Sequence, residues 1–287
     1  MKNYEELTFA DDFMFCKIME ENEDLCKELT ELVLERKIGK IVKNEKQKAI
    51  EPAADGHGVR LDVYFEDDES TIYDIEMQNS DTKELPLRSR YYQGMMDLGH
   101  LDKGVKYSEL PNSYVVFLCT FDLFKKGYHK YSFVPMCREV DGLKLEDKTT
   151  RVFVCAGGDK DDVSDEMKSF IDRLSGKNTK SDLMNRIEAK VKDAIERGLW
   201  RKEYMTLKDK LDEEFDRGIE QGRMLDRIEM VCGKLSKGLD AAIIADHLDL
   251  PIDQVNAIVE VAEKYATDYD AEKIYEELTK AKEAVEI

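Results

Sequence analysis

A polar turn separates two runs of β-branched and aromatic residues between residues 59 and 80, in the sequence VRLDVYFEDDESTIYDIEMQNS. Such a pattern predicts a β-hairpin whose turn, EDDES, is exposed to solvent. Because side chains alternate between the two faces of a strand, Asp62 and Glu76 can point the same way across this hairpin. Asp74 and Gln78 share the face of Glu76. The hairpin therefore predicts carboxylates gathered on one face of a sheet.

The segments around the hairpin predict a mixed α/β domain. Before it, apolar residues recur at three- and four-residue steps from Asp11 to Leu34, the period of an amphipathic helix, and residues 40–50 can form a strand. A helix is expected over residues 84–104, with an apolar stripe formed by Leu87, Tyr91, Met95, Leu98 and Leu101. The run SYVVFLCTFDLF has the length and apolarity of a strand buried on both faces. With two more strands expected before Gly158, residues 1–158 are predicted as one domain.

Residues 159–287 predict a helical C-terminal region. Apolar residues step by four on a charged background, at Leu183, Ile187, Val191, Ile195 and Leu199 and again at Leu207, Leu211, Phe215 and Ile219. Such helices are exposed on one side and need a partner on the other, so they are the candidate interface of a homodimer. Gly198, Gly218 and Gly222 predict interruptions of these helices. Residues 236–264 contain two short helical patterns joined by LDLP, spaced like a helix-turn-helix.

The net charge of −19 limits how the chain can approach nucleic acid, because a field of that sign repels phosphate over most of the surface. Nucleic-acid binding would have to use local basic groups. The candidates are ERKIGKIVKNEKQK, at residues 35–48, and the cluster of Lys83, Arg88 and Arg90.

The sequence also predicts the compartment. No apolar run approaches the roughly 20 residues that a membrane-spanning helix needs. The first residues, MKNYEELTFADDFMF, lack the basic and apolar regions of a signal peptide. The six cysteines are scattered without a CxxC pair, which is typical of reduced, buried thiols. These features predict a soluble protein of the cytoplasm that does not enter a membrane.

Two carboxylates on facing strand positions repel each other unless something compensates their charge. Mg²⁺ is a natural compensation, because it takes one or two carboxylates and keeps its other positions for water and phosphate. The ion would polarise a phosphodiester and lower the pKa of its bound water. Gln78 could orient that water but could not take its proton. The alternative is that an acidic chain carries such residues on solvent-exposed strands without any metal.

Four segments resemble the PD-(D/E)XK nuclease family transposases, and together they cover about the first half of the chain. They are DDFMF in the first helix, RLDVYFEDDESTIYDIEMQ in the hairpin, LPLRSRYYQGMMD in the following helix and SYVVFLCTFDLF in the buried strand. The resemblance implies a restriction-endonuclease-like α/β core, in which helices flank a mixed sheet. The helical tail resembles the tails of that family more loosely.

The resemblance also implies roles for single residues. Asp62 matches the aspartate of the family motif, and Glu76 matches its second acid. The backbone carbonyl of Met77, between the motif residues, is a usual further metal ligand in this fold. Asp12 matches an acid of the first helix and is a further candidate ligand.

Two positions depart from the motif. Leu61 stands where the motif's name has proline, a common departure in the superfamily. Gln78 stands where many such nucleases carry lysine, although members of this family often have glutamine there. Glutamine offers only neutral hydrogen bonds to a developing phosphate charge. Arg88, Arg90 and Lys83 are candidates to supply the missing cation, with ordinary solvated surface residues as the alternative interpretation.

These signals together predict a Mg²⁺- or Mn²⁺-dependent DNA endonuclease acting in recombination or mobile-element biology, with Asp62, Glu76 and Gln78 as catalytic residues. The alternative is a DNA-binding or assembly protein of the same fold whose site is degenerate. Loss of metal-dependent cleavage on changing Asp62 or Glu76 would favour the first hypothesis. Equal DNA affinity without such cleavage would favour the second.

Overall fold

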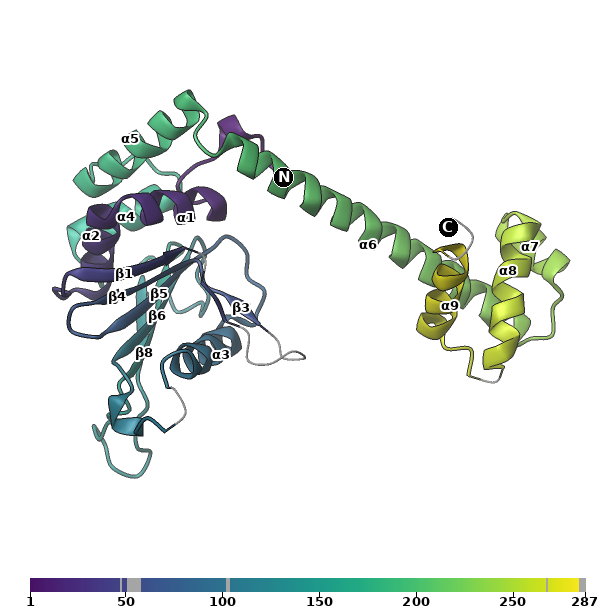
Figure 1. Cartoon of the computed structure of the whole chain (residues 1–287), viewed down its shortest axis with the longest axis horizontal. Coiled ribbons are helices and arrows are strands. Elements are labelled where there is room, and N and C mark those ends of the chain that lie inside the picture. Colours follow the sequence, from purple (N-terminus) through teal and green to yellow (C-terminus); the bar gives the residue numbers. More distant parts are fainter. Residues whose placement is uncertain (47, 51–57, 102–103, 267, 284–287) are drawn as a thin grey trace. The chain divides into compact units, whose positions relative to one another are not determined.

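The computed structural model describes residues 1–46, 48–50, 58–101, 104–266 and 268–283 (Figure 1). The chain divides into two compact units. One comprises Lys2–Tyr204, and the other comprises Met1 and Met205–Ile287.

A six-stranded mixed sheet forms the centre of the first unit. Its strands, in spatial order, are β1 (Ile41–Lys46), β4 (Val63–Asp67), β5 (Ile72–Gln78), β6 (Ser113–Cys119), β8 (Thr149–Cys155) and β7 (Lys130–Phe133). The pairs β1/β4, β4/β5 and β8/β7 are antiparallel, whereas β5/β6 and β6/β8 are parallel. A separate two-stranded ribbon joins β2 (Ala49–Ile50) to β3 (Val59–Arg60).

The predicted hairpin is confirmed as β4 and β5, which pair in a register that sets Val63 opposite Ile75. Four of the seven residues of β5 are apolar or aromatic, and all but Gln78 are buried, because the sheet is covered on both sides. The turn differs from the expectation at one position. Residues 68–70 are exposed, but Asp67 is buried with an exposed fraction of 1%.

Helices cover both faces of the sheet (Figure 1). On one face lies α3 (Leu85–Leu98), and on the other lie α1 (Asp12–Glu21), α2 (Glu23–Leu34), α4 (Asp165–Leu174) and α5 (Asp182–Arg197). Short 3-10 helices occupy Tyr4–Glu6 and Tyr107–Glu109. On the α3 face, the buried apolar cluster includes Leu85, Met96, Ile72, Phe117 and Phe153. This is the mixed sheet flanked by helices that the resemblance implies.

The apolar stripe expected on α3 is wrong. Its members Leu87, Tyr91 and Leu98 are 59%, 40% and 54% exposed. The face turned to the sheet mixes polar with apolar side chains, namely Leu85, Ser89, Tyr92, Gln93, Met95 and Met96. Gln93 is buried there because its amide donates a hydrogen bond to the Ser113 hydroxyl. Hydrophobicity alone therefore selects the wrong side of this helix.

The first unit extends beyond the expected boundary at residue 158, because α4 and α5 pack on α1 and α2. Leu183, Ile187 and Val191 were expected at a homodimer interface. All three are buried inside this unit. α5 ends at Gly198, whose φ of 65° is the left-handed conformation common after a helix.

The second unit is helical. It contains most of α6 (Arg201–Leu235), together with α7 (Ala241–Leu248), α8 (Ile252–Ala262), a 3-10 turn (Glu263–Tyr265) and α9 (Ala271–Glu283). Its core is a cluster of apolar side chains that includes Ile228, Val231, Ile244, Ile258 and Ile274. α7 and α8 pack on each other, in the segment where the sequence indicates a helix-turn-helix spacing.

α6 runs through Gly218 and Gly222, although the sequence predicts interruptions there. A glycine costs a helix only about 1 kcal/mol relative to alanine, so the flanking residues can carry the helix across it. On this helix Leu211, Phe215 and Ile219 are 41%, 69% and 40% exposed. Within the described residues, none of the helices combines the length and apolarity needed to cross a membrane.

Candidate active site

Four carboxyl groups converge where three segments of the first unit meet. Asp12 begins α1, Asp62 lies in a bend just before β4, and Asp74 and Glu76 lie in β5. Carboxylate oxygens of Asp12 and Asp62 lie within 4.8 Å of each other, and Asp62 is hydrogen bonded to Glu76. Segments that lie far apart in the sequence thus build one acidic cluster.

Asp62 and Glu76 are linked from both directions. The backbone amide of Asp62 donates to Glu76 Oε1 at 2.9 Å, and the backbone amide of Met77 donates to Asp62 Oδ2 at 3.2 Å. Asp62 belongs to neither β3 nor β4, so its amide is free to bond outside the strand ladder. The bend therefore fixes the two motif carboxylates against each other, as their facing positions in the hairpin predict.

Asp74 lies deeper than the motif residues. It is fully buried, and Glu76 is only 1% exposed. In the described part of the chain, neither carboxylate oxygen of Asp74 meets a hydrogen-bond donor, unless Glu76 itself carries a proton to share. An ionised carboxylate without a donor is very costly to bury. Asp74 therefore requires a proton or a cation nearby.

Asp62, Asp74 and Glu76 resist ionisation because the pKa of each is raised. Burial, the charge of Glu76 and the charge of Asp12 raise the pKa of Asp62 to about 9. Burial and then Asp74 raise the pKa of Glu76 well above its usual range, and burial and then Asp62 do the same to the pKa of Asp74. Like charges in a dry site cannot all be ionised unless a cation joins them.

Cys16 borders the cluster. It follows Asp12 by one helical turn, and its Sγ lies within 4.8 Å of carboxylate oxygens of both Asp12 and Asp62. The thiol is 1% exposed, whereas Asp12 is exposed. Burial, followed by the charges of Asp62 and Asp12, raises the pKa of the Cys16 thiol far above its usual value. Without a metal, the group is a neutral thiol.

Arg88 on α3 is the cation that reaches the cluster. Its guanidinium donates to Gln78 Oε1 at 3.2 Å and to the Tyr92 hydroxyl at 2.8 Å, and it lies 3.5 Å from Glu76 Oε2. The same group lies over the rings of Tyr92 and Phe117, at 5.2 and 5.8 Å from their centroids. These contacts hold a half-buried positive charge beside the acids.

The structure brings some of the predicted residues together and leaves others outside. The cluster brings together the predicted residues Asp12, Asp62, Glu76, Gln78 and Arg88. Met77 lies between Glu76 and Gln78 in β5. Arg90 and Lys83 are exposed, and neither contacts the cluster in the described part of the chain. On a helix, Arg90 points about 200° away from Arg88, so only one of the pair can face the sheet.

Sequence reasoning missed three members of this site as functional residues. Asp74 carried a usable signal, because it shares the face of Glu76 at a two-residue spacing. Cys16 also carried one, because a spacing of four residues places it on the same side of α1 as Asp12. Tyr92 carried no signal of a contact with Arg88 at this site, because its position there depends on how α3 is rotated against the sheet.

The donor set fits a hard divalent cation. Carboxylate oxygens dominate it, and the Met77 backbone lies between Glu76 and Gln78. Mg²⁺ and Mn²⁺ prefer such oxygen ligands. The buried oxygens of Asp74, which have no donor of their own, are the observation that tests this fit. A cation would relieve a charge arrangement that the chain's own donors leave uncompensated.

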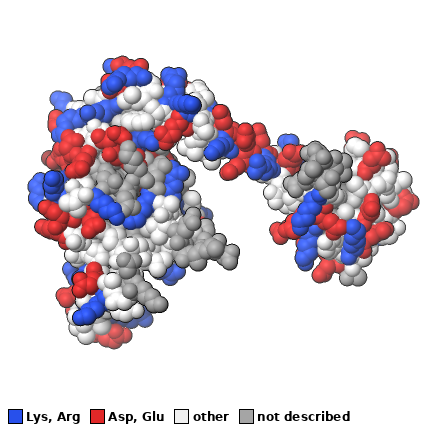
Figure 2. Space-filling view, viewed as in Figure 1, with Lys and Arg blue, Asp and Glu red and all other residues white. Residues whose placement is uncertain are grey.

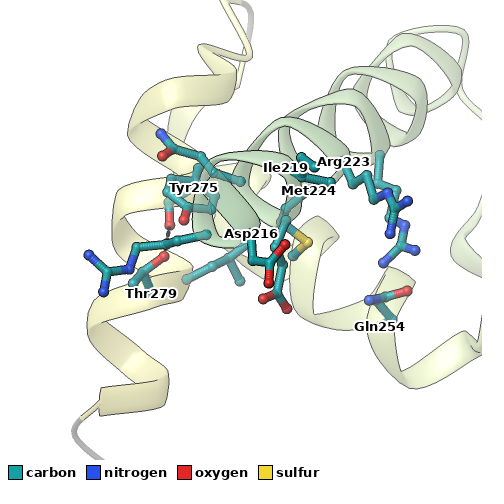
Figure 3. A pocket seen from close by; sticks show the side chains of 12 residues that line it. Asp216, Ile219, Arg223, Met224, Gln254, Tyr275 and Thr279 are labelled. Atoms are coloured by element: carbon teal, nitrogen blue, oxygen red, sulfur yellow. Dashed lines mark hydrogen bonds between the residues drawn. The ribbon is translucent and has the colours of Figure 1, made fainter. Parts of the chain in front are cut away.

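The second unit has a pocket of about 590 Å³ between α6, α8 and α9. Figure 3 shows Arg223 and Gln254 on one side of it and Tyr275 and Thr279 on the other. Three arginines and two acidic residues mix in its lining, which is completed by uncharged polar and apolar side chains. No group of metal-ligating residues lies there among the described residues.

Comparison with known proteins gives one match. The model of a family described as PD-(D/E)XK nuclease family transposase matches residues 10–154, which contain all four carboxyl groups, Cys16 and Arg88. No curated protein and no solved structure matches the chain. The matched range covers half of the chain and ends inside β8.

Proposed function

Because the chain belongs to the PD-(D/E)XK nuclease family transposases, we propose that it is a Mg²⁺- or Mn²⁺-dependent endonuclease that hydrolyses phosphodiester bonds in DNA. Its biological setting would be recombination or mobile elements. The observation that carries the proposal is the pair of half-buried Asp62 and buried Glu76. Two backbone hydrogen bonds join the segments of this pair, which lies beside the buried Asp74. Family membership supports a nuclease-type function, and this cluster supports its dependence on metal.

Asp62, Glu76 and the Met77 carbonyl would hold the ion, and the exposed Asp12 would complete the set from α1. When bound, the ion polarises the phosphodiester and lowers the pKa of a water molecule. The chain's own part is to bind and to orient. Because the hydrogen bonds from Asp62 and Met77 amides fix both motif carboxylates before any ion arrives, little reorganisation is needed.

Gln78 and Arg88 act together in this proposal. Gln78 Oε1 accepts a hydrogen bond from Arg88, so the NH₂ group of Gln78 is left to donate to a water molecule or a phosphate oxygen. Arg88 supplies the positive charge that a lysine would otherwise bring. Its planar fork is well suited to phosphate oxygens, and its charge is permanent. Arg88 on α3 would thereby replace the positive charge that is lost where Gln78 stands in place of lysine.

The surface charge fits a nuclease that engages DNA locally. Figure 2 shows basic and acidic side chains interspersed over the face in view. With a net charge of −19, the chain as a whole repels duplex DNA. The acidic cluster repels phosphate most strongly when no metal is present. Metal binding would therefore both complete the site and allow the substrate to approach it.

The test is cleavage of supercoiled plasmid by the full chain with Mg²⁺, Mn²⁺ or EDTA, beside the isosteric variants Asp62→Asn and Glu76→Gln. We expect metal-dependent cutting by the wild type and a loss of at least about 100-fold in both variants, since each removes a direct ligand. Glu69→Gln, on the exposed turn of the same hairpin, is the control. A folded wild type that binds Mn²⁺ and DNA without cutting would instead identify a degenerate DNA-binding or assembly protein.

The exposed stripe of α6 supports a homodimer as part of the proposal. α5 is covered within its own unit, so Leu211, Phe215 and Ile219 on α6 remain as the unpartnered part of the predicted interface. Residues 201–210 carry four basic and two acidic side chains, whereas residues 211–220 carry one basic and five acidic ones. Two copies of α6 therefore attract each other when antiparallel and repel each other when parallel.

An antiparallel pairing centred on Leu211 sets Leu207 against Phe215 of the second copy. It also brings Lys208 and Lys210 of one copy near Asp212 and Glu214 of the other. We expect the full chain to sediment as a dimer at micromolar concentration and Phe215→Glu to sediment as a monomer. Met230→Glu, which alters another exposed apolar residue of α6, should remain dimeric. A monomeric wild type would contradict this pairing.

A further inference from the structure

Cys16 places a sulfur atom among the carboxylates of the acidic cluster. Its Sγ and one carboxylate oxygen each from Asp12 and Asp62 all lie within 4.8 Å of one another. Around a tetrahedral Zn²⁺, with a Zn–S bond of about 2.3 Å and Zn–O bonds of about 2.1 Å, such atoms would be about 3.6 Å apart. Asp12 is exposed at the start of α1, so rotation of its side chain can close the remaining distance.

A second observation shows that this place favours a cation. Asp74, fully buried in β5, has no hydrogen-bond donor at either carboxylate oxygen among the described residues. It interacts electrostatically with Asp62, the same carboxylate that faces Cys16. A buried carboxyl group that needs either a proton or a cation thus interacts with one of the three ligand residues.

We propose that Cys16 gives this centre a second mode of metal binding, in which thiophilic divalent cations such as Zn²⁺ and Cd²⁺ bind through the Cys16 thiolate together with Asp62 and Asp12. As the metal–sulfur bond forms, the S–H bond breaks and its proton leaves to solvent. The inference rests on the metal centre of the proposed function but does not require DNA cleavage.

The two modes differ in what the thiol does. Mg²⁺ is a hard cation that prefers oxygen, so Cys16 remains a neutral thiol beside it and takes no part in coordination. Zn²⁺ and Cd²⁺ favour thiolate and a four-coordinate arrangement. An ion bound in that way occupies Asp62 and competes with Mg²⁺. Zn²⁺ would therefore act as an inhibitor of the site, and Cys16 would set its potency.

The test is a Cd²⁺ titration of the full chain, followed by the ultraviolet charge-transfer absorption of a thiolate–Cd²⁺ bond. Wild type and Cys16→Ala are compared, with Cys26→Ala as the control, since Cys26 is equally buried on the neighbouring helix α2. We expect Cys16→Ala to lose the high-affinity part of the absorption and to bind Cd²⁺ at least about tenfold more weakly. Cys26→Ala should match the wild type.

Two further variants keep the test decisive. Cys119 and Cys155 lie opposite each other on β6 and β8 and offer another pair of thiols, so Asp62→Asn is included to assign the band. It should weaken the Cys16-dependent absorption and leave any signal from the other pair. Cys16→Ser retains the side-chain volume if the alanine variant does not fold, and it should also lose the band.

An unchanged Cd²⁺ affinity and an unchanged band in folded Cys16→Ala or Cys16→Ser would overturn the inference. The result is independent of the plasmid experiment. Cys16-dependent binding of Cd²⁺ by a chain that cuts no DNA would preserve this inference and contradict the proposed function. Mg²⁺-dependent cutting without any role of Cys16 in Cd²⁺ binding would support the proposed function and contradict this inference.

Discussion

The two ends of the β4/β5 hairpin bury an aspartate in opposite ways. Asp67, at the end of β4, accepts hydrogen bonds from the amides of Glu69 and Thr71 at Oδ1, at 3.0 and 2.9 Å. Its Oδ2 accepts from the Gly39 amide at 3.1 Å and from the Tyr73 hydroxyl at 2.9 Å. Asp74, in β5, is as deeply buried, and no such donor reaches it from the residues that the structure describes.

The difference separates structural acids from functional ones. Four neutral donors hold Asp67 in the turn, because their hydrogen bonds to the charged carboxylate replace the water that it loses on burial. Asp74 lacks that replacement in the described part of the chain and depends on a cation or a shared proton. Glu76 has donors in the Asp62 amide and Arg88. Burial alone therefore does not identify a metal site. A shortage of donors around a buried carboxylate shows that it needs a proton or a cation.

The sharpest test of the comparison is Arg88, because the acidic end of the hairpin relies on this cation and the Asp67 end needs none. Arg88→Gln is expected to lower kcat for plasmid cleavage roughly 100- to 1000-fold, the cost of removing a donor from a developing oxyanion. The measurement is cleavage rate at saturating Mg²⁺. Arg90→Gln, on the exposed side of α3, should cut at the wild-type rate. Equal losses of kcat in Arg88→Gln and Arg90→Gln would show that Arg88 has no specific role in cleavage.

Asp67→Asn should instead lower stability without removing activity. The new NH₂ group would face the Gly39 amide or the turn amides, which leaves donors opposed to donors. We expect the free energy of unfolding to fall by about 2 to 3 kcal/mol, measured by urea denaturation. Glu69→Gln is the matched control on the same turn. A change of stability as small as that of the control would remove the distinction between the two aspartates.

The pH dependence of stability should reveal the acidic end. The pKa of Asp62 is raised to about 9 in the folded chain, whereas the pKa of an aspartate in an unfolded chain is about 3.9. Between these values the folded state holds the extra proton, so raising the pH lowers the free energy of unfolding, by at most about 1.4 kcal/mol per pH unit for one such group. Urea denaturation in EDTA from about pH 6 to about pH 8 measures the slope.

Asp62→Asn should flatten that slope, and Mg²⁺ should flatten it in the wild type, because a bound ion favours the ionised carboxylates. Stability that rises over this range in EDTA would contradict the assignment. Asp67→Asn, whose acid belongs to the other end of the hairpin, should keep the slope of the wild type.

The smallest expected effect is at Asp74. Asp74→Asn replaces a buried carboxyl group, which lacks a donor of its own, by an amide that can donate to Glu76, so we expect the free energy of unfolding in EDTA to rise by about 1 kcal/mol. Added Mg²⁺ should stabilise the variant less than the wild type. The measurement is urea denaturation with and without Mg²⁺. Destabilisation in EDTA would mean that Asp74 has a donor after all.

The hairpin and its facing acids were predictable from the sequence because a two-residue alternation is a strong and local signal. The register that sets Val63 opposite Ile75 carries Asp62 toward Glu76, as that alternation implies. The side chains contributed by helices were less predictable. Choosing between Arg88 and Arg90 requires the rotation of α3 against the sheet, and the polar residues Ser89 and Gln93 on its buried face hide that rotation.

Long-range proximity was also beyond sequence reasoning. Cys16 borders Asp62 only because α1 lies against the start of β4, a contact that no periodicity encodes. The burial of Asp67 depends likewise on Gly39, which approaches the turn from a distant segment. Charge and hydropathy suggested an exposed turn for this acid because they do not register the donors that surround it.

The acidic cluster draws on residues 12, 62, 74 and 76, and β5 is completed on its inner side only by its parallel neighbour β6, which ends at Cys119. Translation delivers these segments one after another from the N-terminus. A nascent chain that stops before β6 has an unpaired β5 edge, and Asp74 and Glu76 have no finished sheet to hold them. Fragments of the protein that end before β6 would therefore lack the assembled cluster and any activity that depends on it.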